Sequence, residues 1–511
     1  MAELKDSTKR QLINTSTLGV GIALVVAIFL IANYFGWKYH QRLDWTGDKI
    51  YTLSEKSTKV LEALDKDVEV VVFMSPADPL FGSVSQLLGS YEAASRRLSV
   101  RYLEVEKNLA EAQSLVDKYE VNSLNVVVFD SGEDRRVVDA TDLADYDYSG
   151  LQFGQQPSMT GFKGEQEFTS AIIDLVESRK PRVLFTAGHG ELDLDDLSPD
   201  GISLARELLG KDNFELESWA TVGEQAVPEG TDLLVVAGPT SNFLEPEVRV
   251  LRDYIESGGR MLFLIDPTLA PAGGLVATGL EPLLEEYGVH LGDDIVVDPA
   301  NPLPFFSADT IFVTAYAEHD ITRSLSQAQL PVILGLARSV GMGEPIEELR
   351  VTELMMTSVE GWGETDLENL QQVELHEDDL GGPVPLAVAV EVIEEENLGA
   401  EVLEGATADE ETAASEELTL SSGDVRLVVV GDSDFATNGQ LQNMPNATLL
   451  ANTLNWLAKR ETLIGIPPKK PEYVRLSLSR SQMSKVTWLV LVVLPGLAVL
   501  LGFAVYWQRR R

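Results

Sequence analysis

A histidine and several acids lie close together in the stretch VLFTAGHGELDLDD, residues 183–196. An apolar run of the kind that forms a buried strand ends there at a turn of small residues. His189 sits on the turn between Gly188 and Gly190, and Glu191 and three aspartates follow. A histidine beside carboxylates can transfer protons or bind a metal ion. The turn also follows a strand, where open α/β sheets place their ligands. We therefore predict that Gly188, His189, Gly190 and Glu191 contact a ligand or a partner.

Catalysis by His189 is the alternative interpretation, with proton transfer or metal binding shared among Glu191, Asp193, Asp195 and Asp196. A zinc site needs two or three His or Cys ligands, and the other histidines, at 40, 290, 319 and 376, have no ligand-like spacing. Acids in this position are also favoured by the dipole of an approaching helix N-terminus. We therefore favour a structural or ligand-contacting turn, and keep a hydrolase as the second hypothesis.

A second cluster lies in GDSDF, residues 431–435, where Asp432, Asp434 and the nearby Asn438 could hold Mg²⁺ or Ca²⁺. Short Asp/Ser turns after a strand more often accept hydrogen bonds from their own backbone. Asp432 and Asp434 are therefore further candidates for ligand or partner contact, and no metal ion is predicted.

Several chemistries are excluded because their residues are missing from the chain. The sequence has no cysteine, so thiol catalysis, thiolate metal sites and disulfides are ruled out. It contains neither G-x-S-x-G nor G-x-x-x-x-G-K-[ST], the serine-hydrolase and phosphate-binding motifs. A net charge of -42 repels nucleic acid. No cofactor and no nucleic-acid partner are predicted.

Between its ends the chain alternates short β-branched runs with amphipathic stretches, a pattern typical of α/β units on largely parallel sheets. A first unit, 44–147, resembles a thioredoxin-like layer. Its expected strands are 68–73, 100–105, 125–130 and 135–139. Its expected helices are 82–98 and 108–119.

A linker, 148–164, leads to a second unit, 165–460. Its expected strands are 181–187, 214–219, 232–238, 260–266, 293–298, 385–392 and 424–435. Its expected helices are 165–178, 199–210, 245–257 and 446–459. Residues 394–418 interrupt this order with ten acids and no base, and such a run predicts a solvated insertion.

Two uncharged apolar runs, 17–37 and 486–507, have the length of membrane-spanning helices and are bounded by aromatic residues. The fold class predicted is therefore two α/β units tethered by one transmembrane helix at each end. Residues 461–485 would form a juxtamembrane linker, and 1–16 and 508–511 short cytoplasmic ends. Lys and Arg flank both ends of each run, so charge alone does not decide the orientation.

Several stretches in this order together resemble a known family: RLDWTGDKIYTLSEKSTKVLEAL, AGHGE, LLVVAGP, GGRMLFLIDP and VVVGDSDFATN. The chain resembles the auxiliary subunit of gliding-motility-type ABC transporters, the GldG-like family. The resemblance implies a two-pass bacterial inner-membrane protein with a periplasmic central region, working beside a separate ABC permease and ATPase. It implies an amidotransferase-like second unit, of a type also likened to a domain of an intraflagellar-transport subunit. Amidotransferase activity itself is excluded without the catalytic cysteine. The ligand of the periplasmic units would be a substrate, a glycan or a partner protein.

Overall fold

The structure is a computed structural model. Apart from isolated positions, it describes residues 52–103, 125–132, 134–147, 158–177, 179–271, 273–300, 310–368, 373–393 and 425–465. Contacts between Cα atoms group residues 53–511 as one compact unit, distinct from residues 1–52. The elements described below all belong to the larger unit.

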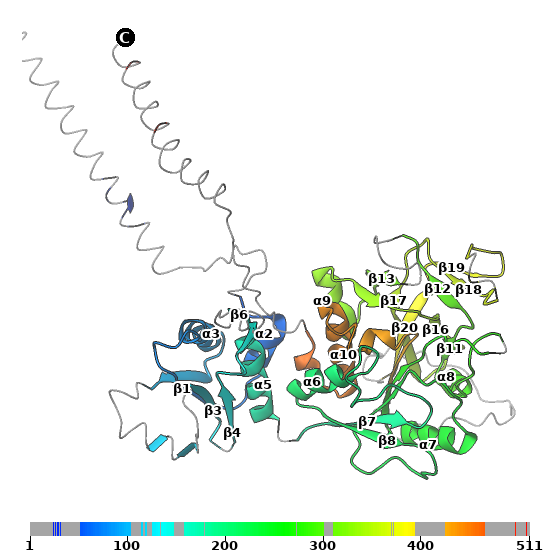
Figure 1. The fold of residues 1–511 in the computed structure, drawn as a ribbon, viewed down its shortest axis with the longest axis horizontal. Helices are drawn as coiled ribbons and strands as arrows, with labels where there is room; N and C mark the ends of the chain where they lie inside the picture. Colours follow the sequence, from blue (N-terminus) through cyan, green and yellow to red (C-terminus); the bar gives the residue numbers. More distant parts are fainter. Residues whose placement is uncertain are drawn as a thin grey trace, which may run out of the picture. The chain divides into compact units, whose positions relative to one another are not determined.

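The first sheet has four strands in the order β2-β1-β3-β4. Figure 1 labels β1, β3 and β4 of this sheet. Their bounds are Val68–Phe73 for β1, Leu98–Tyr102 for β2, Val126–Asp130 for β3 and Arg135–Asp139 for β4. Only β1 and β2 pair in parallel, while β3 pairs antiparallel with both β1 and β4. The prediction of a largely parallel sheet is wrong here, because an apolar run identifies a buried strand without revealing its direction.

Three helices accompany this sheet: α2 (Glu55–Glu62), α3 (Phe81–Ala94) and α5 (Gly164–Val176). A short antiparallel pair, β5 (Ala144–Asp147) and β6 (Ser158–Phe162), precedes α5. The buried apolar side chains of α5 belong to the same core as those of β1, β3, α2 and α3. The helix placed by sequence at the start of the second unit thus packs on the first sheet.

The second sheet has eight strands in the order β14-β17-β20-β21-β10-β9-β7-β8. Five neighbours run parallel: β7 (Arg182–Ala187), β8 (Glu215–Ala220), β9 (Leu233–Ala237), β10 (Arg260–Leu264) and β21 (Arg426–Val430). Three continue antiparallel: β20 (Pro385–Val392), β17 (Leu349–Met356) and β14 (Ala315–Tyr316). This sheet is therefore mixed as well.

Each face of the second sheet has its own hydrophobic core, because successive strand residues point to opposite faces. Val183 and Phe185 join one core, which also contains apolar residues of α6 (Ser203–Lys211), α9 (Asp320–Ala328) and α10 (Met444–Leu457). Leu184 joins the other. That second core contains apolar residues of two further helices, α7 (Glu245–Glu256) and α8 (Glu281–Glu286).

Three small antiparallel sheets complete the described fold. They pair β11 (Val289–Leu291) with β16 (Val340–Met342), β13 (Ile311–Val313) with β15 (Val332–Leu334), and β12 (Ile295–Val297) with β18 (Trp362–Glu364), which also pairs β19 (Leu380–Gly381). The strand expected at 293–298 thus lies in a small sheet, not in the main one. The fold class is a mixed α/β architecture with several small sheets, which corrects the prediction of two largely parallel ones.

The predicted membrane architecture also needs correction. Within the part of the chain that the structure describes, no helix has both the length and the apolar composition needed to cross a membrane. This finding contradicts the tethering by two transmembrane helices and the two-pass, inner-membrane localisation with a periplasmic centre.

Some predictions fall on residues that the structure does not describe. The runs 17–37 and 486–507 lie outside the described residues except at isolated positions, and so does most of the helix expected at 108–119. The acidic insertion 394–418 lies entirely outside them and stays a prediction.

Candidate functional site

His189 lies at the point in the second sheet where the order of the parallel strands reverses. From β7 the chain passes through α6 to β8 on one side, and from β9 through α7 to β10 on the other. The loops that follow β7 and β9 therefore meet at the switch point of the parallel strands. Open α/β sheets bind their ligands at such a point. The sequence predicted that this turn follows the carboxyl end of a strand, and the turn indeed follows β7, which ends at Ala187.

The backbone of the turn requires both glycines. Gly188 has φ of +126° and Gly190 has φ of +83°, values that residues other than glycine rarely adopt. A Cβ atom on Gly190 would also lie 2.0 Å from Oγ1 of Thr240, in the loop after β9. The two glycines thus allow the turn to approach the neighbouring loop closely.

The backbone of His189 ties these loops together. Its carbonyl oxygen accepts hydrogen bonds from the backbone amides of Thr240 and Ser241, at 2.9 and 3.0 Å. Its imidazole ring stacks on Phe243 with the ring centroids 3.9 Å apart. The switch point is therefore occupied by contacts between the protein's own loops.

Both ring nitrogens of His189 face carboxylates. Nε2 lies 3.2 Å from an oxygen of Glu247 in α7, and Nδ1 lies 3.5 Å from an oxygen of Glu191. The side chains of His189, Glu191 and Glu247 are 6%, 1% and 5% exposed. The other oxygen of Glu191 accepts a hydrogen bond from the His189 backbone amide at 2.6 Å. The ring is thus enclosed by acids of its own turn and of the next helix.

Glu247 has two further partners that fix its carboxylate. It accepts hydrogen bonds from the Thr221 hydroxyl at 2.8 Å and from the Leu244 backbone amide at 2.9 Å. Burial would raise the pKa of Glu247, but the hydrogen bonds from Leu244, Thr221 and His189 outweigh it and hold the pKa below its usual value. Glu247 therefore stays ionised and anchors the His189 ring to the start of α7.

This arrangement favours a structural or contact role over proton transfer. A general base must reach the proton that it abstracts, and His189 is buried with its Nε2 already bonded to Glu247. Its Nδ1 lies 3.5 Å from a Glu191 oxygen and has no hydrogen-bond partner among the described residues. Of the acids predicted around it, the structure brings only Glu191 to the ring. Asp193 accepts a hydrogen bond from the backbone amide of Asp195, and Asp196 from that of Ser198.

Sequence reasoning missed Glu247, although a local signal existed. The side chain lies 58 residues from His189 in the sequence. Glu247 is also the third residue of α7, where its carboxylate accepts from the amide before the helix, as in a capping box. That signal predicts the helix start but does not reveal the histidine.

The second predicted cluster, Asp432 and Asp434, lies at the carboxyl end of β21. Asp432 is fully buried, and its carboxylate accepts hydrogen bonds from the backbone amides of Gly335, Asp434 and Phe435. It therefore forms a turn with its own backbone, the structural alternative considered from the sequence.

Asp266, two residues after β10, also joins this cluster, and it was not among the residues predicted from the sequence. Its carboxylate accepts hydrogen bonds from the backbone amide and the hydroxyl of Ser433. Burial raises the pKa of Asp266 to about 6, and the neighbouring Asp434 adds to the effect. Burial likewise raises the pKa of Asp432 well above its usual value, with Asp266 and Asp434 contributing. Asp266 and Asp432 thus share one poorly solvated corner of the sheet, beside the exposed Asp434.

The geometry offers no metal site in the part of the chain that is described. No group of three or more His, Asp and Glu side chains there is placed to hold an ion. Asn438, which the sequence grouped with Asp432 and Asp434, instead donates to the backbone carbonyls of Asp196 and Ser198, at 2.9 and 2.7 Å. It fastens the loop after β7 to the loop after β21.

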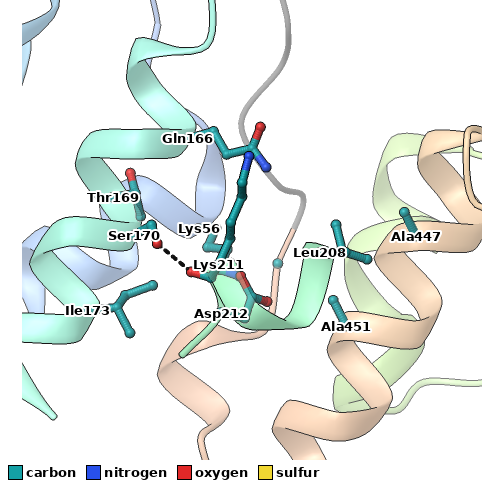
Figure 2. Close-up of a pocket in the computed structure, with 11 residues that line it drawn as sticks. Lys56, Gln166, Thr169, Ser170, Ile173, Leu208, Lys211, Asp212, Ala447 and Ala451 are labelled. Carbon is teal, nitrogen blue, oxygen red and sulfur yellow. Dashed lines mark hydrogen bonds and ion pairs between the residues drawn. The ribbon is translucent and has the colours of Figure 1, made fainter. Parts of the chain in front are cut away.

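A pocket lies between helices of the two sheets, among α2, α5, α6 and α10 (Figure 2). Its lining residues are Lys56, Gln166, Thr169, Ser170, Ile173, Leu208, Lys211, Asp212, Ala447, Ala451 and Gly465. Lys56 pairs with Asp212 at 2.5 Å, and Lys211 pairs with Glu167 at 2.9 Å. Its two cations are therefore already neutralised, and the pocket has no free charge to select an ion. It could not be predicted from sequence, because its walls come from distant segments.

Comparisons with known proteins agree with the sequence resemblance. A sequence model of the family described as "ABC-type uncharacterized transport system" matches residues 180–461. A domain of unknown function matches residues 47–140. The "Intraflagellar transport protein 52 homolog" of Mus musculus is 30% identical over 106 residues, which are 20% of this chain and 24% of that protein. The chain thus spans about a quarter of that relative's length.

Two solved structures are also similar. The "mmIFT52 N-terminal domain" has 18% identity and a TM-score of 0.37, over 54% of this chain and 96% of that one. A putative ThuA-like protein from Bacteroides uniformis has 12% identity and a TM-score of 0.30, over 55% and 93%. The family model matches more than half of the chain and confirms the resemblance to an auxiliary component. The chain therefore belongs to the family of auxiliary components of ABC-type uncharacterized transport systems.

Proposed function

We propose that this chain is a non-enzymatic accessory subunit that binds a partner protein or a glycan, and that a separate permease and a separate ATPase complete the system. The observation that carries the proposal is the family match over residues 180–461, the part of the chain that contains the main sheet. The sequence lacks a G-x-x-x-x-G-K-[ST] loop, so the proposed energy source is another chain.

The geometry of the His189 turn supports a contact role. Its loops are held by hydrogen bonds from Thr240 and Ser241, and its ring is enclosed by Glu191 and Glu247. These contacts preorganise the surface above the parallel strands, and a rigid surface binds with a smaller loss of conformational freedom. The hydrolase hypothesis has no comparable observation in its favour.

The proposal is tested by purifying the affinity-tagged full chain from its native cells, identifying the associated proteins by mass spectrometry and measuring ATP hydrolysis. We expect a permease and an ATPase to accompany the chain, together with ATP turnover. Purification of the chain alone, without ATPase activity, would contradict the proposal.

A second measurement separates the hydrolase hypothesis. Hydrolysis of ester and glycoside reporter substrates by the purified chain should stay at background in both the wild type and His189→Ala. The hydrolase hypothesis would be favoured by a measurable hydrolysis rate in the wild type that is lost in a folded His189→Ala variant.

A further inference from the structure

Three of the five parallel strands begin with an arginine, although β8 begins with Glu215 and Arg182 pairs with Glu217 at 2.6 Å. Arg182, Arg260 and Arg426 are the first residues of β7, β10 and β21. At the opposite end, five segments follow the strands: 188–202, 221–226, 238–244, 265–280 and 431–443. These segments, which we call the acidic edge, contain nine Asp and Glu residues and no Lys or Arg. Parallel strands end at the same side of a sheet, so this charge is concentrated on one side.

Most acids of the acidic edge reach the surface. The exposed ones are Asp193, Asp195, Asp196, Asp200, Glu224 and Asp434. Among them, Asp195 pairs with Arg206 of α6 at 3.2 Å. The edge therefore presents negative charge to solvent from the loops after β7, β8 and β21.

Apolar side chains are exposed on the same edge. Leu197, Val222, Leu244 and Leu269 are 87%, 63%, 59% and 45% exposed. They come from the loops that follow β7, β8, β9 and β10, which are four adjacent strands of the sheet. A single exposed Leu or Val is ordinary, but exposed apolar residues from four neighbouring loops indicate an interaction surface.

Contacts between the loops hold this surface in shape. The Phe243 amide donates to the Thr278 carbonyl at 2.8 Å, which joins the loops after β9 and β10. A Cβ on Gly188 would lie 3.2 Å from Val222, so the loops after β7 and β8 are also in contact. His189 links the loops after β7 and β9, as described above. The acidic edge is therefore preformed.

We propose that the acidic edge docks a cationic, amphipathic segment of a partner protein. This inference rests on the proposed function and specifies the chemistry of the partner. Opposite charges across an interface select the partner and steer its approach. A second copy of the chain carries the same net charge of -42 and is repelled, as are nucleic acid and anionic lipid. The exposed Leu and Val side chains require that the partner segment also carry apolar residues.

The experiment measures binding of a fluorescein-labelled helical peptide of about 18 residues, with Lys on one face and Leu on the other, to the full chain. Fluorescence anisotropy is recorded at an ionic strength of about 0.15 M, where distant surface charges are screened. A charge variant combines Asp193→Asn, Asp200→Asn and Glu224→Gln. Each exposed ion pair strengthens binding about twofold, so we expect the charge variant, which removes three acids, to bind roughly tenfold more weakly.

The matched control removes three exposed acids elsewhere, with Glu215→Gln, Glu229→Gln and Asp253→Asn, and has the same net charge as the charge variant. We expect its affinity to stay within about twofold of the wild type, because charges beyond a Debye length are screened. Equal weakening of both variants would mean general attraction to an acidic protein, and would overturn the proposal.

The apolar half of the proposal has its own pair of variants. The double variant Leu197→Ser and Leu244→Ser should bind the Leu/Lys peptide severalfold more weakly. The control variant combines Val359→Ser and Leu375→Ser, whose side chains are exposed but lie outside the acidic edge, and its affinity should not change. An all-Lys peptide that binds as tightly as the Leu/Lys peptide would also overturn it. If a permease and an ATPase co-purify with the chain but the peptide shows no preference for the acidic edge, only the docking inference fails.

Discussion

Replacing Glu247 should destabilise the protein, because its buried carboxylate serves three donors. Glu247→Ala leaves the His189 ring, the Thr221 hydroxyl and the Leu244 amide without their acceptor. Loss of a cap costs about 1 kcal/mol, and each buried donor left unpaired costs about 1 kcal/mol or more. We therefore expect the free energy of unfolding to fall by about 3 kcal/mol.

Two further variants make this prediction specific. Glu247→Gln keeps the shape and one acceptor oxygen, so its loss should be smaller, about 1 kcal/mol. Glu245→Gln changes an exposed acid in the same first turn of α7 and should cost less than about 0.5 kcal/mol.

The assay is urea denaturation followed by tryptophan fluorescence and circular dichroism, with coincident transitions required before a single free energy is extracted. A loss of less than about 1 kcal/mol for Glu247→Ala would refute the reasoning. A Glu245→Gln loss as large as that of Glu247→Ala would refute it as well.

The pH dependence supplies a second readout of the same carboxylate. Because the pKa of Glu247 is lowered in the folded state, its ionisation contributes stability that is present above the unfolded pKa and is lost as pH falls through the folded one. The wild type should therefore lose more stability than Glu247→Gln on acidification below about pH 4.3. Parallel acid limbs would contradict this.

Three other predictions concern the remaining features. The pKa of Asp266 is raised to about 6 in the folded state, so its ionisation lowers the free energy of unfolding as pH rises from about 4 to 6. Asp266→Asn should remove this pH dependence, which urea denaturation at a series of pH values would measure. An unchanged pH profile would contradict the prediction. Gly190→Ala must place a Cβ against Thr240 at positive φ, so we expect a loss of about 2 kcal/mol or more, whereas Gly89→Ala, inside α3 with open space around it, should be neutral or stabilising. Deleting 394–418 with a short Gly/Ser bridge should leave the melting temperature nearly unchanged, since the run has little to bury, and a fall of many degrees would show that it is packed.

The family and the local elements of the main sheet could be predicted from the sequence alone. β7, β9, β10 and β21 are continuous apolar runs, and such runs are buried strands in nearly any context. Pro246 in the first turn of α7 and the glycines after its last residue marked that helix, because proline is tolerated only at a helix start and glycine favours its end. The Gly188-His189-Gly190 turn was found for the same local reasons.

Which of these elements meet depends on contacts between distant parts of the chain. Strand direction depends on pairing over long separations, so the parallel and antiparallel halves of both sheets could not be derived from apolar runs. The same limit applies to the site: Glu247 reaches His189 from 58 residues away, and Asp266 reaches Ser433 from 167 residues away. Hydropathy reads composition along the chain, whereas these contacts arise only when loops from different parallel strands end at one edge of the sheet.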